Sequence, residues 1–207
     1  SIPAVKAIIG GAIADEFVGA QPEAVVRAFV ERLMPTEADH AVARGVAAES
    51  DGDRAAAEAA YRQAIEHDTN HPSARLGLGR VLESAQPEEA LVELERVLPG
   101  TRERAEADRI AARIRLRQQG GDGEAELRER VARNSKDVAA RLALGKQLAT
   151  AGAHEEALQH LLEAVRLDRR YDDDAARKAM VDVFELLGPN HPLTQRYRDE
   201  LAKILFA

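Results

Sequence analysis

The stretch Val138–Asp168 reads VAARLALGKQLATAGAHEEALQHLLEAVRLD and contains two amphipathic helical patterns on either side of Ala151-Gly152. Leucine, valine and alanine recur at helical spacing in each half, so each predicted helix has one apolar face. Small residues, Gly145 in the first half and Ala157 in the second, stand where two packed helices must approach closely. The stretch therefore predicts a helical hairpin, which buries its apolar face only by stacking on neighbouring hairpins.

Further hairpins are predicted upstream. Gly45 and Ala57 stand in the same relative positions as Gly145 and Ala157, and Gly79 follows Gly45 by 34 residues. That spacing resembles the tetratricopeptide repeat (TPR), a helix-turn-helix unit of 34 residues. We expect a mainly α, TPR-like solenoid of about four units over residues 36–171. Residues 172–207 are expected to form a C-terminal helical capping pair.

One of these units, Thr101–Asn134, has lost most of the recurring residues and is predicted from spacing and from its neighbours. Its turn is expected at Gly120–Gly123. The first helix of the unit is expected to present one apolar face, made of Ile110, Ala111, Ile114 and Leu116.

Residues 1–34 follow a different pattern. Two short apolar runs, Ala4–Ile9 and Ala12–Val18, flank Gly10-Gly11 and predict a β-hairpin. A helix that begins at Pro22 follows, with an apolar face made of Val25, Val26, Phe29, Val30 and Leu33. The order resembles the C-terminal third of a thioredoxin fold, with Ile2 and Pro3 in the place of the cis-proline loop. A complete domain of that kind has further strands and helices before this part. The resemblance therefore leads us to expect that the sequence beginning at Ser1 is a truncated product.

Composition excludes several classes of function. The net charge is −7, which argues against a nucleic-acid partner, and cysteine is absent, so disulfides and thiol chemistry are excluded. No membrane span or signal peptide is evident, and we expect a cytoplasmic monomer without cofactor or metal. His67 and His71 lack a third ligand with supporting spacing, and Asp172-Asp173-Asp174 lacks the glycine and distal glutamate of a calcium loop. No catalytic constellation is present, so we expect no enzyme activity from this chain.

The remaining candidate site is the concave groove of the solenoid. By TPR register, the first helices of successive units direct a mixture of aliphatic and charged side chains toward it. These candidate peptide-groove residues are Val42, Val46, Glu49, Leu76, Arg80, Glu83, Leu142 and Lys146. The absence of asparagine among them argues against a clamp for a C-terminal carboxylate and favours contacts with apolar polypeptide. The alternative is that several of them only pack between repeats.

A thioredoxin-like remnant joined to TPR-like units and a helical cap resembles the bacterial thioredoxin–TPR fusion proteins known as chaperedoxins (CnoX/YbbN-like). The resemblance rests mainly on the junction EFVGAQPEAVVRAFVERLMPTEAD and on the ending ARKAMVDVFELLG…LAKILF. It implies a holdase that binds unfolding client proteins under oxidative stress and passes them to chaperone machinery. Two alternatives remain open: an adaptor for one folded partner, and the substrate-recruiting part of a longer thiol oxidoreductase.

Overall fold

The computed structural model describes residues 3–9, 12–117 and 123–206. It opens with two antiparallel strands, β1 (Ala4–Ile9) and β2 (Ala12–Val18), followed by helix α1 (Glu23–Leu33). These bounds confirm the predicted hairpin and helix, whereas the Gly10-Gly11 turn lies outside the described residues. The strands pair Val5 with Phe17, and the register shifts at a bulge between Ala7 and Ile8.

Helix α1 packs on one face of this hairpin. The Phe17 and Phe29 rings meet edge to face with centroids 5.0 Å apart, and Arg32 donates to the Asp15 carboxylate at 2.8 Å. Of the five residues predicted to form its apolar face, Phe29 is buried, whereas Val25 and Val30 are exposed. The sequence therefore predicted a larger buried face on α1 than the structure has, because a two-stranded hairpin offers little surface to cover a helix.

The rest of the chain is helical. Its elements are α2 (Glu37–Ser50), α3 (Arg54–His67), α4 (Pro72–Leu82), α5 (Pro87–Glu95), α6 (Arg104–Arg117), α7 (Glu124–Arg133), α8 (Val138–Thr150), α9 (His154–Leu167), α10 (Ala175–Leu187) and α11 (Pro192–Leu205). The expected helices are therefore all present. A capping box begins α2: Thr36 Oγ1 accepts from the Asp39 amide, and the Asp39 carboxylate accepts from the Thr36 amide.

Glycines allow the paired helices to approach closely, as the sequence pattern predicted. A Cβ on Gly45 would lie 2.6 Å from the Tyr61 ring, and one on Gly145 would lie 2.6 Å from Leu161. A Cβ on Gly79 would lie 2.5 Å from Leu94. Each glycine of a first helix therefore receives a large side chain of the second helix, and helices α2 and α3, α4 and α5, and α8 and α9 pack as hairpins.

The unit expected at Thr101–Asn134 is built differently. Helix α6 packs mainly against α10, α5 and α8, whereas α7 packs against α8. In the described part of the chain α6 and α7 do not form a packed pair. The prediction that they form one hairpin was therefore wrong. Of the turn expected at Gly120–Gly123, residues 120–122 lie outside the described residues.

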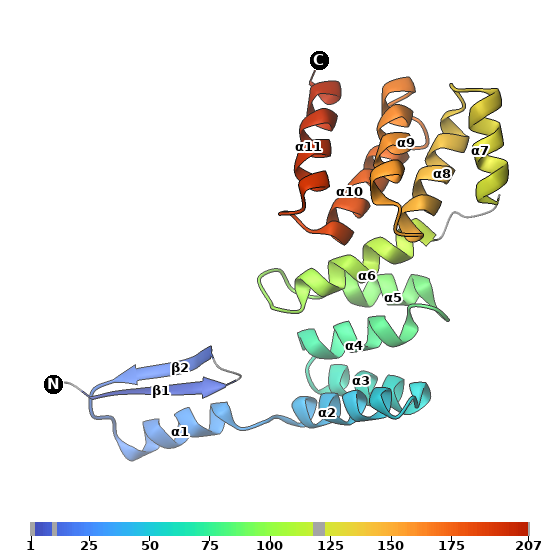
Figure 1. Cartoon of the computed structure of the whole chain (residues 1–207). Helices are drawn as coiled ribbons and strands as arrows, with labels where there is room; N and C mark the ends of the chain where they lie inside the picture. Colours follow the sequence, from blue (N-terminus) through green and yellow to red (C-terminus); the bar gives the residue numbers. More distant parts are fainter. Residues whose placement is uncertain (1–2, 10–11, 118–122, 207) are drawn as a thin grey trace.

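Helix α6 contributes to two separate cores. Ile110, Ala111 and Ile114 belong to a buried cluster with side chains of α3, α4 and α5. Leu116 belongs instead to the buried cluster of α7 to α11. The expectation of one face was wrong because residues 114 and 116 are about 200° apart around a helix. Figure 1 shows the result: α2 to α6 run across the view, most helices from α7 to α11 stand upright, and α6 lies between the groups.

Candidate functional site

The first helices of the N-terminal group line a cavity of about 310 Å³. Four of the predicted groove residues border it: Val42 and Val46 from α2, and Leu76 and Arg80 from α4. Val46 is half exposed, whereas Leu76 is buried. The cavity thus offers an aliphatic wall with two guanidinium groups, those of Arg80 and Arg102, and the carboxylates of Glu103 and Glu106 among its other lining groups. The structure places these four predicted residues around one cavity.

Tyr61 forms the floor of this cavity and was not among the predicted groove residues. Its ring is fully buried between α2 and α4, against Gly45 and Gly77. Its hydroxyl has no hydrogen-bond partner of normal geometry among the described residues. Burial, followed by the nearby Glu49 carboxylate, raises the pKa of Tyr61 to about 12, so the hydroxyl keeps its proton and is a donor. Gly45 and Gly77 are the sequence signal for this ring, because both leave room for it.

Charged side chains form an ordered rim around the cavity. Arg80 donates through Nε and an Nη atom to both oxygens of Glu49, at 2.9 and 3.0 Å. It also lies 3.5 Å from Glu106 of α6. The hydrogen bonds with Glu49 raise the pKa of Arg80. Glu49 therefore orients Arg80 instead of facing a ligand independently.

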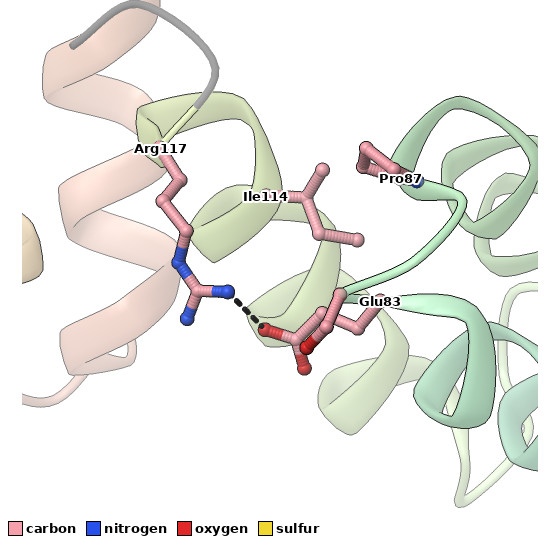
Figure 2. A pocket seen from close by; sticks show the side chains of 5 residues that line it. Glu83, Pro87, Ile114 and Arg117 are labelled. Atoms are coloured by element: carbon pink, nitrogen blue, oxygen red, sulfur yellow. Dashed lines mark ion pairs between the residues drawn. The ribbon is translucent and has the colours of Figure 1, made fainter. Parts of the chain in front are cut away.

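Glu83 lies in a second, smaller cavity of about 230 Å³, which Ser84, Pro87, Ile114 and Arg117 also line. Figure 2 shows Arg117 reaching toward Glu83 from α6, with Ile114 and Pro87 beside them. Arg113 makes the closer contact and donates to both Glu83 oxygens at 2.7 and 2.5 Å. These hydrogen bonds lower the pKa of Glu83. Both acceptor atoms of Glu83 are thus engaged by the chain itself.

The structure does not bring the last two predicted groove residues to either cavity. Leu142 and Lys146 of α8 are buried, with 5% and 7% of their surface exposed. Leu142 shares a buried cluster with Leu116 of α6. Burial lowers the pKa of Lys146, and the neighbouring Asp182 of α10 opposes that shift. The expected single groove is therefore divided, and its C-terminal part is covered.

The remaining sequence candidates have structural roles. His67 is the last residue of α3, whereas His71 caps α4 by accepting from the Ala74 amide and contacts Asp39 at 3.2 Å. Asp173 pairs with Lys178 at the start of α10. The described residues hold no group of three or more potential metal ligands. Pro3 accepts a hydrogen bond from the Gly19 amide at 2.8 Å, and Ile2 lies outside the described residues.

Two family models match the chain, and both are described as tetratricopeptide repeat, over residues 48–114 and 117–206. Together with the paired helices and the glycine contacts, these matches place the chain in the tetratricopeptide-repeat family. The family is one of protein-binding modules. The two matches meet at the end of α6, where the direction of the helices changes.

Solved structures with related folds are distant. The MamA protein shares 19% identity with a TM-score of 0.40, over 84% of this chain and 92% of that one. YrrB, described as a TPR protein with an unusual peptide-binding site, shares 22% identity with a TM-score of 0.39, over 86% and 98%. The search of curated proteins gave no match. Within the described residues, no helix is long and apolar enough to cross a bilayer.

Proposed function

We propose that the chain holds exposed apolar segments of unfolding client proteins in the cavity between α2, α4 and α6. The observation that carries the proposal is the aliphatic wall that Val42, Val46 and Leu76 form along this cavity. An aliphatic side chain placed against Val42, Val46 and Leu76 loses apolar contact with water.

The chemistry of this cavity favours broad selection of clients. Its apolar contacts are non-directional, and aliphatic side chains occur in every polypeptide. Such contacts require neither ATP nor covalent chemistry. The proposal therefore describes a holdase that keeps clients from aggregating and transfers them to folding machines, with oxidative stress as the condition and the cytoplasm as the location.

The proposal also assigns roles to the three parts of the chain. Residues 36–171 hold the client, and residues 172–207 close the exposed end of the repeats. Residues 1–34 are the end of a thioredoxin-like domain, supported by the strand–strand–helix order and by the contact between Phe17 and Phe29. That part contains no cysteine, so no redox step is assigned to this chain.

The test uses Val46→Glu, which places a charge on the aliphatic wall at a half-exposed position. Val92→Glu on α5 is the matched control, because Val92 is similarly exposed (45% against 50%) and does not line the cavity. The measurement is light scattering of heat-unfolded citrate synthase and, separately, of reduced insulin. We expect wild type and Val92→Glu to suppress aggregation of both proteins near stoichiometry, and Val46→Glu to need a several-fold excess. Equal suppression by Val46→Glu would remove the cavity as the client site.

A second candidate function is an adaptor for one folded partner. The ordered contact between Arg80 and Glu49 favours it, because a bidentate pair presents charge in a fixed direction and selects a complementary surface. The two functions differ in how many unrelated proteins the chain is expected to bind. Binding of several unrelated unfolded proteins supports the holdase, whereas one saturable folded partner, lost on Arg80→Ala, supports the adaptor.

A further inference from the structure

Helix α6 has two opposite faces, and each contacts a different half of the molecule. Arg113 donates to Glu83 of the N-terminal group, whereas Arg115 donates through Nε to Asp182 of α10 at 2.8 Å. The apolar residues divide in the same way: Ile110 and Ile114 pack into the N-terminal cluster, and Leu116 packs into the C-terminal one. Because residues 113 and 115 are about 200° apart around the helix, α6 bridges the two halves.

The C-terminal surface that α6 covers is made by α8 and α10. These are the first helices of their units, so this surface corresponds to the one that α2 and α4 present in the N-terminal half. In the N-terminal half that surface borders an open cavity. In the C-terminal half the corresponding surface carries a helix, and two residues expected to face a ligand, Leu142 and Lys146, are buried.

The covered surface carries charges suited to an arginine-bearing helix. Asp182 is almost completely buried, and Arg115 lies 2.7 Å from it and 3.6 Å from Glu185. Both carboxylates belong to α10. A buried carboxylate is costly unless cations compensate it. Lys146 of α8 acts on Asp182 electrostatically, and the cation that hydrogen-bonds to Asp182, Arg115, comes from the helix that occupies the surface.

We propose that the α8–α10 surface is a binding site for an amphipathic helix that carries an arginine, and that α6 occupies this site in cis. A partner helix with the same pattern, a leucine one residue after an arginine and an alanine three residues before it, competes with α6. This site is distinct from the aliphatic cavity proposed to hold clients. Displacement frees Leu116 and Arg115 while Ile110, Ile114 and Arg113 keep α6 on the N-terminal half.

The experiment uses the full chain and a labelled, end-capped peptide of residues 104–117, RAEADRIAARIRLR, at physiological salt. Fluorescence anisotropy measures its affinity for wild type, Arg115→Ala and Arg113→Ala. Arg115→Ala weakens only the contact of α6 with α10, so we expect this variant to bind the peptide at least about tenfold more tightly than wild type. Arg113→Ala is the matched control on the opposite face, and we expect it to bind as wild type does.

Three further measurements make the result specific. Adding Asp182→Asn to Arg115→Ala is expected to weaken binding at least about tenfold, and a scrambled peptide of the same charge is expected not to bind. Hydrogen exchange on wild type with excess peptide gives a readout that needs no variant: protection of α8 and α10 is expected to persist while protection of α6 falls. Failure of the peptide to bind Arg115→Ala, equal gain from Arg113→Ala, or insensitivity to Asp182→Asn would each overturn the proposal.

Discussion

The guanidinium group of Arg115 lies 2.7 Å from the carboxylate of Asp182, although 67 residues separate them in the chain. The contact joins α6, which completes the core of the N-terminal repeats, to α10 of the C-terminal group. Burial raises the pKa of Asp182 even though Arg115 opposes that shift. The two halves of the solenoid are therefore joined by a partly desolvated ion pair as well as by apolar packing.

The energetic coupling of this pair is measurable by a double-mutant cycle. We expect Arg115→Ala and Asp182→Ala each to lower the free energy of unfolding, with a coupling energy of about 1–2 kcal/mol, because each single change leaves a charge partly buried without its partner. Urea unfolding followed by circular dichroism gives the values. The exposed pair Arg27 and Glu23 is the control, with a coupling expected below about 0.5 kcal/mol. Equal coupling in the two pairs would contradict the buried character of the first.

Gly45 is expected to tolerate no side chain. A methyl group there would lie 2.6 Å from the Tyr61 ring, which is held on its other side by Gly77. Gly45→Ala should therefore lower the free energy of unfolding by about 1–3 kcal/mol through overpacking, despite the better helix propensity of alanine. Gly123→Ala serves as the control, because a Cβ at Gly123 meets nothing within 4 Å. Thermal unfolding of both variants tests this, and an unchanged stability of Gly45→Ala would refute the close approach of α2 and α3.

Stability at acid pH should depend on the capping box of α2. Hydrogen bonds from the Thr36 side chain and backbone lower the pKa of Asp39 from 3.8 to about 2. A carboxyl group whose pKa is lower in the folded state stabilises the fold above its unfolded pKa and loses that contribution as it is protonated. We expect the difference in unfolding free energy between wild type and Asp39→Asn to be constant above about pH 4. It should shrink as the pH falls toward 2. A difference that does not change with pH over this range would show that Asp39 caps the helix without its charge.

Three consecutive aspartates before α10 have left-handed backbone, with φ of 48° at Asp172, 55° at Asp173 and 61° at Asp174. This conformation costs residues with a Cβ about 1–2 kcal/mol, and glycine avoids the cost. We expect Asp172→Gly to be more stable than Asp172→Ala by about 1 kcal/mol, and because both changes remove the same charge, their difference isolates the backbone. At Asp51, where φ is −81°, the order should be reversed, with alanine better by about 0.5–1 kcal/mol. Chemical unfolding of the four variants gives both differences.

The sequence by itself determined the helices and the pairing of α2 with α3, of α4 with α5 and of α8 with α9. Gly45 with Tyr61 and Gly145 with Leu161 are each 16 residues apart, so one pattern specifies the same close approach in both units. Such contacts are local, and helical periodicity reports them directly. The aliphatic cavity follows from the same register, since Val42, Val46 and Leu76 lie on the first helices of adjacent units.

Only the tertiary structure decided which partner α6 takes. Periodicity records that Ile114 and Leu116 are apolar, but it does not say which of several apolar surfaces each one meets. A second stripe, Ala112 and Leu116 at a spacing of four, was the sequence signal that α6 is buried on two sides. The choice between α7 and α10 depends on total buried area and on the pairing of Arg115 with Asp182, both of which arise from residues far apart in the chain. Non-local contacts of this kind also buried Leu142 and Lys146, which local register had placed in the open groove.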